Sequence, residues 1–174
     1  MQRAKQSLLR LCLMAMMGVL LVASKEALAF LPNIELVTLL TILFTLVFGR
    51  LALGGVAVFL LLEGLLYGFG FWWVMYLYIW PLLVLLTFLL RCFKRAWQWA
   101  LVAGVYGLCF GTLCSLFYLT MWDLPKIISW VIAGFPFDCT HAAGNFILTL
   151  LLYTPLRRAL EELKKQIGPQ KKSA

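Results

Sequence analysis

Three polar side chains open an apolar stretch in the C-terminal third of the chain: Asp138, His141 and Asn145, within GFPFDCTHAAGNF. Residues three and four positions apart lie on the same face of a helix, so a helix here places the three in one stripe. His141 is the only histidine in the chain. Asp138 could cap this helix, and the other two could bond to neighbouring helices. The arrangement that we favour is that all three project into a ligand cavity.

Metal and covalent chemistry have weaker support in this stretch. Asp138, Cys139 and His141 are one and two positions apart, so on a helix their side chains do not converge on a zinc ion. Thr140 and Cys139 could act as nucleophiles, but no feature of the sequence marks either as activated. We therefore predict no metal site and no cofactor, and a protein that is not an enzyme.

A lone carboxylate, Glu63, lies within the apolar run 51–67, and Tyr67 follows one turn later. Inserting a carboxylate into a membrane span costs about 2.5–3.5 kcal/mol, so such a residue faces protein, water or a partner. One interpretation is a structural hydrogen bond to a neighbouring helix. The other is that Glu63 and Tyr67 contact a ligand in an outward-facing cavity.

A dense aromatic run covers residues 69–80. Trp and Tyr gather at membrane interfaces, which accounts for part of the run. Trp73, Tyr76 and Trp80 are spaced three and four apart and so share a helix face, where they could stack on a planar ligand. The preceding GFGF segment, residues 68–71, is flexible enough to act as a lid.

The elements that position these residues are expected to be membrane helices. The chain is 64% hydrophobic, whereas soluble domains are about 45–50% apolar. We predict an all-α integral membrane protein with six transmembrane helices in a single domain, residues 1–174, with short basic tails at 1–7 and 157–174. Residues 121–137 are expected to form a connection outside the spans. The predicted spans are residues 8–30, 34–48, 51–67, 72–90, 97–120 and the stretch 134–153.

The charges predict the orientation of these spans. Counting Lys and Arg in alternate loops puts thirteen on the side of both termini and two, Lys25 and Lys126, on the other. The positive-inside rule therefore places both termini in the cytoplasm of a multi-pass protein of the bacterial plasma membrane. The net charge of +8 suits contact with membrane lipid and is weak support for nucleic acid. No GxxxxGK[ST] motif is present, so active transport would need a partner to supply energy.

Three segments resemble a known family: AFLPNIELV at 29–37, LLEGLLYGFGFWW at 61–73 and GFPFDCTHAAGNF at 134–146. The chain is similar, over nearly its whole length, to the substrate-binding S component of an energy-coupling factor (ECF) type ABC transporter. The resemblance implies capture of a vitamin or related micronutrient at the outer face, with cobalamin as a first guess. The residues that it singles out as binding the ligand are Asn33, Glu35, Trp73, Tyr76, Trp80, Asp138, His141 and Asn145.

The resemblance also implies partners. An S component docks on a transmembrane coupling protein, which is driven by two cytosolic ATPases, and it topples in the membrane to deliver its ligand. Small residues on the first helix let helices approach closely and would form the docking face. Here Ala23 and Ala27 are four apart but near the outer end of the first span, and Ala15 and Gly18 are three apart.

Two other functions compete with this one. A small structural membrane protein of a bacterial cell-shape complex would have this size and would bind no small molecule. An intramembrane enzyme using Asp138, His141 and Glu63 would turn over substrate without ATPase partners. Neither alternative is marked by a motif in the sequence.

Overall fold

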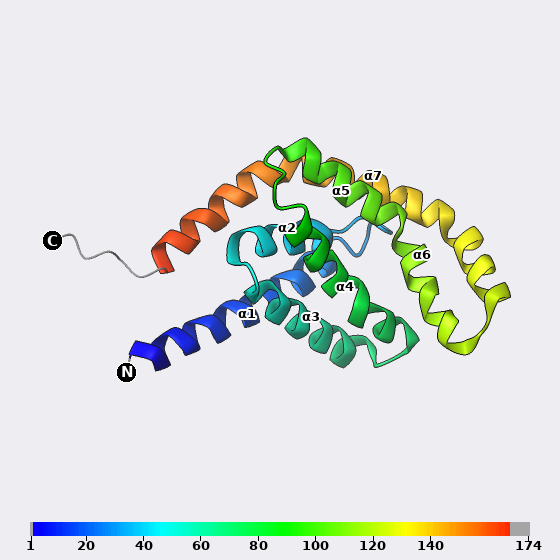
Figure 1. Cartoon of the computed structure of the whole chain (residues 1–174), viewed down its shortest axis with the longest axis horizontal. Coiled ribbons are helices and arrows are strands. Elements are labelled where there is room, and N and C mark those ends of the chain that lie inside the picture. Colours follow the sequence, from blue (N-terminus) through cyan, green and yellow to red (C-terminus); the bar gives the residue numbers. More distant parts are fainter. Residues whose placement is uncertain (1, 168–174) are drawn as a thin grey trace.

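The computed structural model of the chain describes residues 2–167 and is helical throughout, with 86% of these residues in helices and none in a strand. Its first four helices and its last three are arranged around one apolar core (Figure 1). The elements are α1 (Gln2–Ala27), α2 (Val37–Phe48), α3 (Leu51–Tyr67), α4 (Phe71–Leu89), α5 (Ala96–Leu108), α6 (Phe110–Ser115), the 3₁₀ helix η1 (Leu116–Met121) and α7 (Leu124–Ile167).

α2, α3 and α4 begin and end within three residues of the predicted spans, whereas α1 begins at Gln2, inside the predicted tail 1–7, and ends at Ala27. α3 covers residues 51–67, as predicted. Gly49 and Gly68 end α2 and α3 with φ angles of 64° and 85°, in the left-handed region that favours glycine. Hydrophobic runs and glycine breaks were therefore sufficient to place α2, α3 and α4.

Length and composition decide which of these helices could cross a membrane. Two of them, α1 from Ala4 to Ala27 and α4, are long and apolar enough to cross a membrane. A third span is formed if α5 and the segment Phe110–Met121, which meet at 46°, are counted as one bent helix pair. α2 and α3 are apolar but shorter, with 12 and 17 residues.

The expected connection at residues 121–137 is wrong, because α7 already begins at Leu124 and includes residues 124–137. This helix has 44 residues and includes Pro136 and Pro155. At 1.5 Å per residue it is about 66 Å long. Asp123 caps it by accepting a hydrogen bond from the backbone N–H of Lys126 at 3.0 Å. Each proline removes one backbone donor, yet α7 is continuous across both. The helix packs along α5, α2, α6 and η1.

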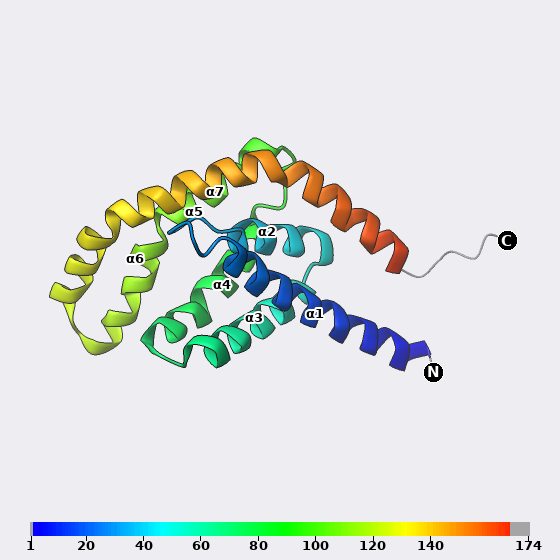
Figure 2. The ribbon, with the colours of Figure 1, turned by 180° about the vertical axis from the view of Figure 1, so that it is seen from behind.

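α2 lies at the centre of the fold, with nine of its twelve residues buried. It contacts α3, α4 and α7, while α1 lies along α3, and α5 lies along α7 (Figures 1 and 2). α7 also holds α2 at its C-terminal end, where Lys164 Nζ donates to the carbonyl oxygen of Val47 at 2.6 Å. A cation at this end of a helix satisfies a carbonyl that has no partner within the helix.

Candidate functional site

A cavity of about 410 Å³ lies between the α1–α2 connection and the facing sides of α4 and α7. The connection, residues 28–36, forms one wall, and the start of α6 and the ends of α1 and α3 complete the lining. Seven of the ten residues predicted to bind a ligand line this cavity. They are Asn33, Glu35, Tyr67, Tyr76, Trp80, Asp138 and His141.

The polar stripe of α7 meets the start of α2 in one hydrogen-bonded network. Glu35 accepts hydrogen bonds from the backbone N–H of Thr38 at 3.0 Å and from its hydroxyl at 2.5 Å, so it caps α2. His141 Nε2 lies 3.2 Å from Glu35 Oε1. One helix turn further along α7, Asn145 Nδ2 donates to Thr38 Oγ1 at 3.2 Å. Asn145 is thus part of the network behind the cavity wall and does not line the cavity.

The charge state of Glu35 follows from these contacts. Burial raises the pKa of its carboxyl, but the hydrogen bonds from His141 and Thr38 and the attraction to His141 outweigh burial and leave the pKa below its ordinary value of 4.5. An ionised carboxylate only accepts hydrogen bonds, so the ring nitrogen Nε2 of His141 is the donor in this pair. The wall of the cavity therefore carries a carboxylate held in place by α7.

Asp138 caps a helix, but not the one that contains it. α7 begins fourteen residues earlier, at Leu124, and Asp138 Oδ1 instead accepts the backbone N–H of Gly111 at 2.9 Å, where the chain bends between α5 and α6. A Cβ atom at position 111 would lie 2.5 Å from Asp138 Oδ2, so any larger residue there would have to displace the carboxylate. Asp138, His141 and Asn145 are all buried on one side of α7, which confirms the shared helix face.

Aromatic rings form the wall opposite the carboxylates. Tyr76 and Trp80 pack edge to face with ring centroids 5.7 Å apart, and Phe110 packs against both of them at 6.1 and 5.8 Å. His141 meets Phe110 at 4.9 Å. The indole N–H of Trp80 is buried and has no hydrogen-bond partner among the described residues. This unpaired donor lies in a residue that lines the cavity.

Trp73 does not belong to this wall. Its indole N–H donates to the carbonyl oxygen of Leu60 at 2.8 Å, and its ring packs edge to face on Phe69. The helical spacing that predicted a common face for three aromatic residues therefore holds for Tyr76 and Trp80, whereas Trp73 joins α4 to α3.

Glu63 is fully buried and forms an ion pair with Lys25 across the α1–α3 interface. Its second oxygen, Oε1, has no partner among the described residues. Lys25 lies over the ring of Tyr67 at 4.7 Å, and both of these residues line the cavity, whereas Glu63 lies behind them. The pair thus makes the interhelical contact proposed for Glu63, with Lys25 as the partner.

Several residues that line the cavity were not predicted from the sequence. Lys25 and Glu26 close one end, and Phe110 supplies an aromatic surface from the bend between α5 and α6. Lys25 and Glu63 carry opposite charges near the same ends of two neighbouring runs, a signal that could have paired them. Phe110 stands in an unbroken apolar run, and nothing in the sequence distinguishes it.

The small residues predicted to dock a partner divide into two sets. Ala15, Ala23 and Ala27 are exposed along α1. Gly18 is buried against α3, where an added Cβ would lie 2.6 Å from Val58 Cβ. Gly18 therefore brings α1 close to α3 within the chain.

The geometry suits non-covalent binding of a small ligand. One wall is aromatic, and the other carries Glu35, Asp138 and His141. Comparisons of the chain with protein-family models, curated proteins and solved structures found no match.

Proposed function

We propose that this chain is the substrate-binding component of a membrane transporter of the energy-coupling factor type, and that it captures a vitamin or related micronutrient in the cavity beside α2. The observation that carries the proposal is the convergence of residues from distant parts of the chain on one cavity: Asn33 and Glu35, Tyr76 and Trp80, and Asp138 and His141. Two of the three segments that resemble the family supply most of these residues.

Binding is favoured over catalysis because the titratable groups are already engaged. Glu35 is bonded to Thr38 and His141, Asp138 accepts the N–H of Gly111, and Lys25 is paired with Glu63. A general base or nucleophile needs a group free to reach the substrate. Groups fixed in this way instead give a rigid, preorganised wall, which reduces the cost of binding.

The lining also suggests the chemistry of the ligand. Three carboxylates, Glu26, Glu35 and Asp138, outnumber the single lysine, Lys25. A neutral or cationic ligand with N–H or O–H donors and a planar ring would match the carboxylates and the aromatic wall. The volume of about 410 Å³ is near the lower end of the roughly 300–1,000 Å³ usual for ligand pockets. It favours a small heterocyclic vitamin or precursor over cobalamin.

The proposed arrangement in the plasma membrane has six spans: α1, α2, α3, α4, the bent pair α5 and Phe110–Met121, and α7. The start of α1, the α2–α3 turn and the end of α7 lie at the same end of the molecule (Figure 1). This arrangement and the positive-inside rule support cytoplasmic termini and a cavity open to the outside. Delivery would require the transmembrane coupling protein and its two ATPases, with the exposed stripe of Ala15, Ala23 and Ala27 as the docking face.

Native mass spectrometry of the purified protein, followed by denaturing extraction, tests the proposal. We expect a stoichiometric small molecule, either copurified or taken up from a mixture of vitamins that includes cobalamin. The variant Asp138→Asn should lose most of it, while Asp123→Asn, which alters an exposed cap at the start of α7, should retain it. Absence of any bound molecule after incubation would reject the binding function and favour a structural membrane protein.

A further inference from the structure

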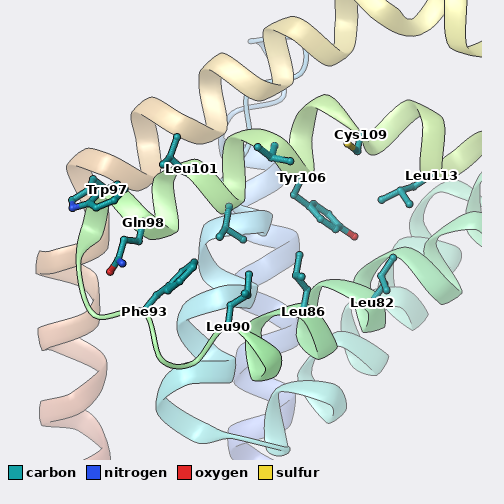
Figure 3. Close-up of a pocket in the computed structure, with 12 residues that line it drawn as sticks. Leu82, Leu86, Leu90, Phe93, Trp97, Gln98, Leu101, Tyr106, Cys109 and Leu113 are labelled. Carbon is teal, nitrogen blue, oxygen red and sulfur yellow. The ribbon is translucent and has the colours of Figure 1, made fainter.

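A second cavity, of about 690 Å³, is an apolar groove between α4 and α5 on the outer surface of the bundle. Figure 3 shows leucines of α4 on one side of it and apolar and aromatic residues of α5 on the other. At the far end of the groove, Tyr106 of α5 donates to the carbonyl oxygen of Ile79 in α4 at 2.6 Å. Tyr78 of α4 donates to that of Leu113 in α6 at 2.8 Å. Between this junction and the α4–α5 connection, the side chains leave the groove open.

The near end of the groove is strongly basic. Arg91, Lys94 and Arg95 are exposed in the connection, beside the groove residues Phe93 and Trp97. No acidic residue occurs between Glu63 and Asp123 in the sequence, and none of the three basic residues forms an ion pair within residues 2–167. Their charge is therefore not neutralised by the part of the chain that the structure describes.

Gln98 holds this basic connection at the mouth of the groove. Its Oε1 accepts hydrogen bonds from the backbone N–H groups of Lys94 at 3.0 Å and Arg95 at 2.9 Å. The connection is thus fixed to the first turn of α5, next to Trp97, a residue type that concentrates at membrane interfaces. Basic residues, an interfacial tryptophan and the open end of the groove all lie together.

The dimensions of the groove match one leaflet of a bilayer. From Leu82 to Leu90 α4 rises about 12 Å, and from Trp97 to Cys109 α5 rises about 18 Å. Half of the hydrocarbon thickness is about 15 Å. A chain entering at the basic end would therefore reach the Tyr106 junction near the middle of the membrane.

The composition of the lining distinguishes a lipid from a partner helix. Close helix contacts in membranes use small residues, as Gly18 and Gly55 do between α1 and α3. The groove contains neither glycine nor alanine and is lined mainly by leucine, valine and aromatic side chains. Such a surface accommodates a flexible hydrocarbon chain better than it accommodates a helix backbone.

We propose that this groove binds one acyl chain of an anionic phospholipid, with the phosphate of its headgroup held by Arg91, Lys94 and Arg95. The site is separate from the cavity beside α2, and the inference does not depend on the ligand of that cavity. It rests on the juxtaposition of an apolar groove one leaflet deep and an uncompensated basic cluster at its mouth.

Native mass spectrometry with defined lipids tests the proposal. The purified protein is exchanged into detergent containing equal amounts of phosphatidylglycerol and phosphatidylcholine with identical acyl chains. We expect preferential retention of phosphatidylglycerol. Replacing Arg91, Lys94 and Arg95 together by Gln should weaken this retention by roughly a hundredfold, since each basic residue near an anionic headgroup contributes about fivefold.

Two further sets of variants test the contact with the lipid headgroup and the contact with the acyl chain separately. Replacing three other exposed basic residues, Lys5, Arg10 and Arg158, by Gln removes the same charge and should leave retention unchanged. Leu86→Trp or Leu82→Trp fills the groove and should abolish retention although the basic cluster is intact.

Three results would overturn the proposal: equal retention of both lipids, retention of phosphatidylglycerol by both groove-filling variants, or a second protein chain that Leu86→Trp displaces. Thermal unfolding of each variant in detergent shows whether it is folded, and having two groove-filling variants keeps the test valid if one of them is not.

Discussion

The buried indole N–H of Trp80 has no partner among residues 2–167, while its ring packs against Phe59, Tyr76 and Phe110. Leaving a buried donor without an acceptor costs free energy, so a ligand acceptor at this point would be stabilising. Trp80→Phe keeps an aromatic ring and removes the donor. We expect the affinity for the small molecule recovered from the wild-type protein to fall about 2–10-fold, measured by equilibrium dialysis. Trp122→Phe, at a residue 93% exposed, is the control, and equal affinities in all three proteins would exclude this contact.

The Lys25–Glu63 pair predicts a stability effect that a second substitution reverses. Lys25→Met leaves the fully buried Glu63 carboxylate without its partner. Because Lys25 is 32% exposed, we expect a loss of about 2–3 kcal/mol, less than for a fully buried pair. That loss corresponds to a decrease in Tm of roughly 4–12 °C. The double variant Lys25→Met/Glu63→Gln should recover most of the Tm. A double variant as unstable as the single one would show that the charge pair is not the cause.

The lowered pKa of Glu35 predicts how the stability of the protein falls at acidic pH. Its pKa is lowered in the folded protein, so its contacts stabilise the fold above the ordinary value of 4.5. This contribution is lost as the pH falls through the lower pKa of the folded state. Tm measured in detergent from about pH 7 down to about pH 3 should therefore decline in the wild type. Glu35→Gln should have a lower Tm at neutral pH and a shallower decline in acid, and parallel curves would contradict the assignment.

At the scale of single helices, the contact between α6 and α7 depends on one glycine. Gly111→Ala would place Cβ 2.5 Å from Asp138 Oδ2, and we expect a destabilisation of about 1–3 kcal/mol. Gly134 is a matched control because a Cβ there meets no atom within 4 Å. Gly134→Ala, inside α7, should stabilise by about 0.5–1 kcal/mol. Thermal unfolding should therefore give a lower Tm for Gly111→Ala and a higher Tm for Gly134→Ala than for the wild type. Equal changes in Tm would contradict the close contact between Gly111 and Asp138.

The elements that the sequence predicted well are those whose limits are set locally. α3 ends where Gly68 allows a left-handed conformation, and its apolar run fills the whole helix. α7 was misjudged because Gly134 and Pro136 are breakers only when nothing else supports the helix. Here the helix continues across both residues, and α7 packs on α5, α2, α6 and η1 elsewhere along its length. Such long-range packing is not visible in a local pattern.

The same difference between local pattern and long-range packing explains which parts of the candidate site could be predicted. Asp138, His141 and Asn145 were placed correctly on one face because helical period alone decides it. Which side chains they meet could not be predicted, since Glu35 lies 106 residues from His141 and Gly111 lies 27 residues from Asp138. Trp73 is the opposite example. Its spacing predicted that it would share the face of Tyr76 and Trp80, but its indole N–H bonds to the carbonyl oxygen of Leu60 in α3.

At the scale of the whole molecule, the proposed orientation predicts which connections face outward. In a variant without its native cysteines, Lys126→Cys at the start of α7 should react with a membrane-impermeant thiol reagent in intact cells. Arg50→Cys, in the α2–α3 turn, should react only after permeabilisation. Both positions are exposed, so both must react in detergent. Labelling of Arg50→Cys from outside would reverse the orientation.

The attachment of α2 to α7 at both ends also fixes the order in which the protein can be completed during synthesis. Glu35 and Thr38 hold its first turn through His141 and Asn145, and Lys164 holds its last turn through Val47. His141 is translated 106 residues after Glu35, a delay of about 5–20 s at ordinary rates of elongation. Once α4 has been made, α2 has its neighbours α1, α3 and α4 but neither of its end attachments. The wall of the cavity is therefore among the last parts of the molecule to become ordered.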